Sequence, residues 1–302
     1  MAKIGAKKTA TKTEGPATGL PAGIRMSNNH YLEVFRALIS GPSGVGKTFC
    51  AATMSEHFPK DLDSTYDEEL TLSDMLWCSV DAGALTGLGQ FNITVPEISL
   101  LEDIMRPPKK GETKFYQADL IRALAKMLGL VKDAVCNHGI RTVVLDTASQ
   151  LNREICTYWA DPCRRPSDDF KYWRVVRDTE ASFFPKLLTL PCNLIILSHE
   201  KAVLDGVSAA EKRLKAVAPA GDHQFTLAIS GGALGDYYAN LDVAVTLLSR
   251  RKPGSKAVIR KLHPFGADGR VGKCRLQHLL NDTEEPHLQN LYQQLKRREK
   301  SE

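Results

Sequence analysis

A glycine-rich stretch carries the residues best suited to hold phosphate. It reads Gly41-Pro-Ser-Gly-Val-Gly-Lys47-Thr48 and matches G-x-x-x-x-G-K-[ST] at every fixed position. Glycines let successive backbone N–H groups turn inward around phosphate oxygens, and the helix that follows adds its positive N-terminal end. The lysine of this pattern reaches the β- and γ-phosphates, and the hydroxyl of Thr48 binds Mg²⁺. The loop therefore predicts a nucleoside triphosphate site formed by Gly41, Pro42, Ser43, Gly44, Val45, Gly46, Lys47, Thr48 and Phe49.

A second acid is needed to complete the magnesium shell, normally at the end of a neighbouring buried strand. The segment "TVVLDT" places Asp146 in such a position. A carboxylate after an apolar strand is costly to bury unless it meets a cation or hydrogen-bond donors. We therefore predict that Asp146 and Thr48 hold Mg²⁺. The alternative is that Asp146 caps the helix expected from "TASQLNREI".

The elements that must position these residues alternate between strands and helices. Unbroken apolar runs, typical of strands buried on both faces, occur at 31–41, 74–81, 140–146 and 192–200. Helical patterns occur at 47–58, 116–139, 168–191 and 284–300. This alternation predicts an α/β fold with a parallel sheet that is covered on both faces.

The details of these elements give further expectations. The apolar stripe of the helix at 116–139 runs through positions 121, 124, 128, 131 and 135. The stripe of the next helix runs through Trp173, Val176, Phe183 and Leu187. The segment 91–114, which is rich in Pro and Lys, is expected to be a surface excursion, and 241–265 to be a hairpin at the sheet edge.

The order of these motifs resembles the RecA core. The phosphate loop is followed by a strand with Asp81, a helix, "TVVLDT", a helix and "NLIILSHEK", over about residues 30–275. The chain is especially similar to short RecA-like ATPases of bacteriophages, some of which act with single-strand annealing or recombination functions. The resemblance implies a RecA-like P-loop NTPase domain with a mostly parallel central sheet, flanking helices and an edge β-hairpin. We expect a disordered basic tail at 1–25, this domain at 26–284, and a C-terminal helix and basic tail at 285–302.

The resemblance also implies roles for individual residues. Ser198 and His199 fall where RecA-like ATPases place a polar sensor of the γ-phosphate, and the segment 201–225 matches the DNA-contacting loop. The alternative for His199 is a strand-end histidine bonded to backbone. RecA-like enzymes also place a catalytic glutamate where this chain has Asp81. Either Asp81 replaces that glutamate and orients the attacking water, or hydrolysis is slow.

Together with these residues, the resemblance implies a Mg²⁺-dependent ATPase that acts on single-stranded DNA in phage recombination or replication. The alternatives are a nucleotide-switched assembly or loader protein with little hydrolysis and, third, a small-molecule kinase. No N-K-x-D motif occurs, which argues against a GTPase, and the distal "TVVLDT" strand argues against a nucleoside monophosphate kinase.

We expect partners of three kinds: single-stranded DNA, a recombination or single-strand-binding protein, and further copies of the chain. Candidates for a finger that reaches a neighbouring copy are Arg250, Arg251, Lys273 and Arg275. Tyr237 and Tyr238 could stack on bases, although their apolar neighbours favour core packing.

Composition sets the remaining limits. The net charge of +5 lies in the termini, since residues 1–14 carry four lysines and one glutamate and residues 296–302 four basic and two acidic residues. Such tails either contact nucleic acid or are solvated termini.

The seven cysteines form no C-x-x-C pair, which argues against a zinc site or a disulfide framework. No apolar run is long enough to span a bilayer, and the N-terminus has no apolar signal region. We therefore expect a cytoplasmic protein without membrane contact, in the host cytoplasm if it is encoded by a phage.

Overall fold

The computed structural model describes the greater part of the compact unit Val34–Glu302. The described residues are 34–59, 69–81, 83, 85–100, 105–106, 116–117, 119–202, 225–229, 240–252, 254, 258–263, 273–274 and 286–299. The basic tail expected at 1–25, the centre of the 201–225 segment, and Tyr237, Tyr238 and Arg275 lie outside these residues. Within the described part of the chain, no helix has the length and apolar character needed to cross a membrane.

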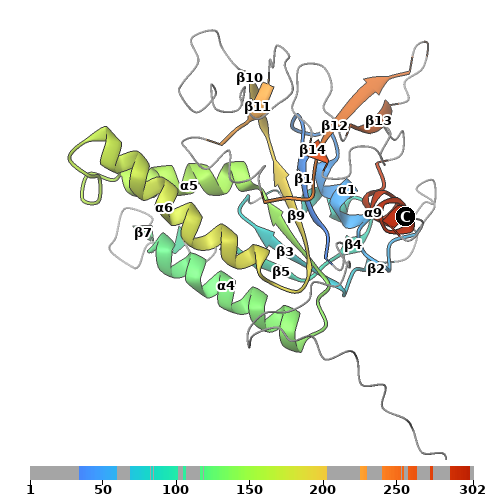
Figure 1. Ribbon diagram of the computed structural model, residues 1–302, viewed down its shortest axis with the longest axis horizontal. Coiled ribbons are helices and arrows are strands. Elements are labelled where there is room, and N and C mark those ends of the chain that lie inside the picture. Colours follow the sequence, from blue (N-terminus) through green and yellow to red (C-terminus); the bar gives the residue numbers. More distant parts are fainter. Residues whose placement is uncertain are drawn as a thin grey trace, which may run out of the picture. The chain divides into compact units, whose positions relative to one another are not determined.

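An eight-stranded sheet forms the centre of this unit, in the order β13-β12-β1-β9-β8-β3-β5, with β14 also paired to β12 (Figure 1). Neighbouring strands from β12 to β5 are parallel, whereas β13 and β14 run antiparallel to β12. The strands are β1 Arg36–Ser40, β3 Met75–Ser79, β5 Glu97–Ser99, β8 Thr142–Asp146, β9 Asn193–Ser198, β12 Val243–Arg251, β13 Val258–His263 and β14 Lys273–Cys274. The sheet and its edge hairpin β12–β13 confirm the predicted fold class.

Strand β9 lies between β1, which leads into the phosphate loop, and β8, which ends in Asp146. Ser40 pairs with Ser198 and Asp146 pairs with Leu197, so the three carboxyl ends lie level. Parallel strands direct the loops that follow them to one edge of the sheet. The segments after β1, β8 and β9 therefore meet there.

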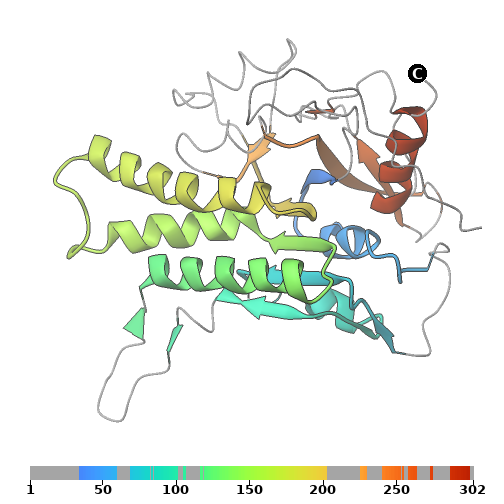
Figure 2. The ribbon, with the colours of Figure 1, turned by 60° about the horizontal axis from the view of Figure 1, so that its bottom comes forward.

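Helices cover both faces of the sheet. Helices α4 (Leu120–Asn137), α5 (Ala148–Ala160) and α6 (Asp169–Leu188) lie on one face, and α1 (Lys47–Ala52) and α9 (Leu288–Glu299) lie on the other (Figures 1 and 2). The remaining elements are α2 Thr86–Gly89 and three small two-stranded sheets, β2 Leu70–Thr71 with β4 Ile93–Thr94, β6 Met105–Arg106 with β7 Tyr116–Gln117, and β10 Glu200–Ala202 with β11 Phe225–Leu227.

Four expectations about these elements need correction. The helix after the phosphate loop ends at Ala52 rather than near residue 58, because the chain continues in turns. The segment 91–114 is not only a surface excursion, since β5 joins the main sheet beside β3. Ile121 is 39% exposed, because Asp119 caps α4 and turns Leu120 inward instead. Trp173 is 42% exposed, because the N-terminal part of α6 extends beyond the sheet (Figure 1).

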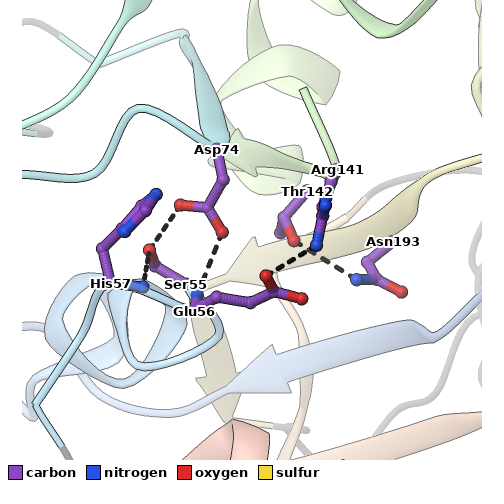
Figure 3. A network of polar contacts seen from close by, with 7 residues as sticks. All are labelled: Ser55, Glu56, His57, Asp74, Arg141, Thr142 and Asn193. Carbon is purple, nitrogen blue, oxygen red and sulfur yellow. Dashed lines mark hydrogen bonds and ion pairs between the residues drawn. The ribbon is translucent and has the colours of Figure 1, made fainter. Parts of the chain in front are cut away.

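A polar network at the amino ends of the strands fixes the segment that follows α1 (Figure 3). The Asp74 carboxylate accepts hydrogen bonds from the Ser55 hydroxyl and, at 3.0 Å, from the Glu56 backbone N–H. The Arg141 guanidinium, beside this network, donates to the Glu56 carboxylate at 2.6 Å. This network lies at the opposite end of the strands from Asp146, so its role is to hold α1 on the sheet.

Replacing Asp74 by Asn should lower the free energy of unfolding by about 1–2 kcal/mol, because an amide cannot accept both hydrogen bonds and one buried donor loses its partner. Urea unfolding at neutral pH measures this loss. Asp133→Asn, which removes a carboxylate with only exposed contacts to Asn137 and His138, is the control and should unfold close to the wild type. An Asp74→Asn protein as stable as the wild type would contradict the assignment.

Candidate functional site

The phosphate loop connects β1 to α1, and each glycine has a separate reason for its place. A Cβ atom on Gly41 would lie 2.5 Å from the carbonyl oxygen of Leu247 in β12, so only glycine fits this close approach. Gly44 and Gly46 have φ angles of 74° and 100°, which side-chain-bearing residues rarely adopt. The glycines of the pattern therefore lie where the backbone needs them to turn its N–H groups into the loop.

Lys47 lies at the centre of the loop and is buried. Its ammonium donates to the carbonyl oxygens of Gly41 and Pro42, each at 2.9 Å, and lies 3.4 Å from Nδ1 of His199. Burial lowers the pKa of Lys47 to about 8, while the charges of Asp146 and Glu200 oppose the fall. The side chain is therefore charged at neutral pH and is held beside the position expected for phosphate.

Asp146 is buried at the end of β8 and faces the start of α1. Its Oδ2 atom accepts hydrogen bonds from the hydroxyl of Thr48 and the indole N–H of Trp77, each at 3.2 Å. Burial raises the pKa of Asp146 to about 6 and the charge of Asp81 adds to the rise, although Trp77, Thr48 and Lys47 oppose it. The capping alternative is wrong, because α5 is capped by Thr147, whose side chain accepts from the N–H of Gln150.

His199 follows β9 and faces the ammonium of Lys47. Because an ammonium can only donate, Nδ1 is the acceptor and the ring proton lies on Nε2. Burial lowers the pKa of His199 and Lys47 lowers it further, although Asp81 opposes the fall, so the ring is neutral at pH 7. Ser198 does not share this position, since its hydroxyl donates to the His199 carbonyl at 3.0 Å. Of the two sensor candidates, only His199 contacts Lys47.

Asp81 lies just beyond β3, exposed to solvent. Its Oδ1 atom accepts from the backbone N–H of Gly83 at 3.2 Å, and its charge acts on both Asp146 and His199. Lys47, Asp146, His199 and Asp81 therefore belong to one site. The role of each residue in catalysis stays a prediction.

Two residues in this site were missed from the sequence. Glu200 accepts from the hydroxyl of Ser40 at 3.1 Å and its charge acts on Lys47, and Trp77 donates to Asp146. The available signal for Glu200 was its place beside His199 at the end of an apolar strand. Trp77 gave no signal, because an apolar strand residue is expected simply to pack.

Other predicted residues lie elsewhere. The ring of Phe49 packs against Phe58 and Phe91, with centroids 5.3 Å and 4.9 Å apart. Arg250 and Arg251 are on the exposed end of β12, and Lys273 is in β14. Their proposed contact with a neighbouring copy stays a prediction.

The donor set suits ATP with Mg²⁺. The Thr48 hydroxyl and the Asp146 carboxylate are oxygen ligands of the kind that Mg²⁺ prefers, and this ion commonly takes its other ligands from phosphates and water. No group of three or more His, Cys, Asp or Glu side chains that could hold a metal occurs among the described residues. The site therefore fits a magnesium ion that arrives with phosphate better than a metal held by protein alone.

The phosphate loop and the strand order define a P-loop fold of the class in which one strand lies between β1 and the strand of the magnesium acid, Asp146, an arrangement that the predicted RecA-like core shares. No protein-family model and no curated protein matches the sequence. Among solved structures, the chain is similar to a KaiC-like protein of the hyperthermophilic archaeon Pyrococcus horikoshii OT3, with 12% sequence identity and a TM-score of 0.39. That similarity covers 84% of this chain and 87% of the other. The fold class rests on strand order and loop rather than on this similarity.

Proposed function

We propose that the chain binds ATP with Mg²⁺ and hydrolyses it to act on single-stranded DNA, in the recombination or replication of a bacteriophage. The observation that carries the nucleotide part is the convergence of Lys47, Asp146 and His199 at the carboxyl ends of three adjacent strands. When bound, ATP supplies the phosphoanhydride bond to be cleaved and Mg²⁺ offsets its charge. Lys47 and the loop N–H groups hold the phosphates, and Thr48 and Asp146 hold the ion.

The remaining site residues act on water and on the phosphate that leaves. The Asp81 carboxylate orients the attacking water and accepts its proton. The neutral His199 ring exchanges its contact with Lys47 for one with the γ-phosphate, so its position depends on whether that phosphate is present.

Strand order supports a link from His199 to the segment proposed to contact DNA. Strand β10 begins directly after His199, and β11 pairs with it from the other end of that segment. The backbone N–H of Ala228 also donates to the carbonyl of His199 at 2.8 Å. A movement of His199 would therefore reach both ends of the segment at once. The proposal has three further parts. The basic termini contact DNA, a recombination protein is a partner, and several copies of the chain assemble.

A second candidate is a nucleotide-switched loader that hydrolyses little. The observation that favours it is the side chain of Asp81, which is one methylene shorter than that of a glutamate and is exposed rather than fixed by packing. In that version the ATP-bound state recruits a protein partner, and hydrolysis only resets it.

ATP hydrolysis with and without single-stranded DNA tests the proposal. We expect DNA to raise the turnover at least about tenfold, and a slowly hydrolysed ATP analogue to retain the protein on DNA. Turnover that DNA does not change, without retention on DNA, would overturn the DNA-directed function and leave the loader. Duplex DNA of the same length is the control, and transfer of phosphate to a nucleoside monophosphate would show a kinase.

A further inference from the structure

The edge hairpin contacts the phosphate loop through an arginine from outside. Arg260 in β13 donates from Nε to the carbonyl oxygen of Val45 at 2.9 Å. A Cβ atom on the next residue, Gly46, would lie 3.1 Å from the same Nε atom and 3.4 Å from Cδ of Arg260. The absence of a side chain at Gly46 therefore also gives the arginine its place against the loop.

The contact fixes a peptide plane. The carbonyl of Val45 and the N–H of Gly46 belong to one planar peptide unit and point in opposite directions. Because Arg260 holds the carbonyl of Val45, the N–H of Gly46 points away from the hairpin arginine. Gly46 has a φ angle of 100° and no Cβ atom, so the peptide plane before it can rotate more readily than one before a residue with a side chain.

The sheet in turn holds Arg260. It pairs with Ser249 of β12 in the antiparallel hairpin, and β12 pairs with β1 in parallel. The same strand β12 places the carbonyl of Leu247 against Gly41 at the start of the loop. Both ends of the phosphate loop therefore rest on the hairpin, one on β12 and the other on β13.

We propose that Arg260 is a positioning residue for phosphate binding: through the carbonyl of Val45 it orients the N–H of Gly46 toward the bound phosphates. This inference rests on the proposed nucleotide binding. The edge hairpin would then help to shape the phosphate site, although the sequence motif of the loop contains no residue of the hairpin. Because the guanidinium acts through the carbonyl of Val45, its effect on phosphate binding comes from the hydrogen bond rather than from its charge.

Three substitutions in the hairpin separate these effects. Arg260→Met removes the donor and the charge but keeps a side chain that reaches as far as the position of Nε. Arg260→Gln removes the charge but keeps an N–H donor at the same number of bonds from Cα. Lys252→Met, at the exposed turn of the same hairpin, removes one charge without touching the loop.

The measurement is titration calorimetry with inorganic tripolyphosphate and with MgATP, together with the KM and kcat of hydrolysis. For Arg260→Met we expect both ligands to bind about tenfold more weakly, with KM raised, kcat nearly unchanged and the melting temperature of the free protein unaltered. Arg260→Gln and Lys252→Met should bind within about threefold of the wild type.

Each contrary result has one meaning. If Arg260→Met binds like the wild type, or if Arg260→Gln is as weak as Arg260→Met, Arg260 does not orient the loop through its hydrogen bond and the inference is overturned. If the wild type binds neither tripolyphosphate nor MgATP, the proposed nucleotide binding itself fails, and the inference fails with it.

Discussion

Replacing Lys47 by Ala should abolish hydrolysis and weaken ATP binding at least about a hundredfold, because its ammonium is the positive charge that the structure places within the phosphate loop. Its three donors are all directed at the mouth of the loop, toward the carbonyls of Gly41 and Pro42 and the ring of His199. An alanine leaves the backbone N–H groups in place but removes this charge. Titration calorimetry and phosphate release measure the two effects.

The folded state should survive this change. Burial disfavours the charged form of Lys47, so its removal relieves a cost that offsets the loss of two hydrogen bonds to the loop. We therefore expect the melting temperature of the nucleotide-free protein to change little. Lys132→Ala, on the exposed side of α4, is the matched control and should leave binding unchanged. Full hydrolysis by Lys47→Ala would mean that this loop is not the site of the reaction.

Local chemistry explains why the main site residues could be predicted from sequence. The fixed glycines and Lys47-Thr48 form a site within eight consecutive residues, so their spacing alone determines their geometry. Asp146 could be predicted because an acid after an apolar strand has few explanations. The parallel direction of the main strands could be predicted by the same logic, since unbroken apolar runs separated by helices are typical of a parallel sheet.

Contacts set by register between distant strands could not be predicted. Trp77 reaches Asp146 because β3 pairs with β8, and Arg260 reaches Val45 because β13 folds back beside β12. In the sequence the first of these residues resembles a core residue and the second a solvated charge on a hairpin. The exposure of Trp173 has the same origin: helical periodicity gives the apolar face of α6 but not where that helix leaves the sheet.

Three acidic residues in the site act on different partners. Asp146 is buried against α1, Asp81 lies beyond the end of β3, and Glu200 lies beyond β9. Their charges act on different partners, since Glu200 supports the charged form of Lys47 whereas Asp81 acts on Asp146 and His199. This division is consistent with a metal-binding role for Asp146 and a water-directed role for Asp81.

Replacing Asp146 by Asn should have two opposite effects, a large loss of hydrolysis and a gain in stability of the free protein. An amide oxygen is a poor ligand for Mg²⁺, so we expect turnover to fall about a hundred- to a thousandfold. Stability should rise because burial raises the pKa of Asp146 from 3.8 to about 6, which makes the ionised carboxylate unfavourable in the folded protein. The shift corresponds to about 3 kcal/mol as an upper limit.

The sign of the pH dependence follows from that shift. The folded protein binds the Asp146 proton more tightly than the unfolded chain, so this carboxyl stabilises the fold below about pH 4 relative to neutral pH, and the contribution is lost as pH rises through about 6. Asn cannot ionise, so Asp146→Asn should be the more stable protein at pH 7.5 and equal to the wild type near pH 4. Urea unfolding in EDTA, without nucleotide, measures the difference at both values.

Asp74→Asn is the matched control, because it also removes a buried carboxylate from the end of a strand. Asp74 accepts its hydrogen bonds from Ser55 and Glu56, which need an acceptor, and it lies far from the phosphate loop along the strands. It should lose stability and keep its turnover, whereas Asp146→Asn should gain stability and lose turnover. If Asp146→Asn is instead destabilised at pH 7.5, the ionised Asp146 is a structural acid of the same kind as Asp74. The assignment of Asp146 to Mg²⁺ would then lose its physical basis, because an acid that the fold itself needs requires no metal to explain its burial.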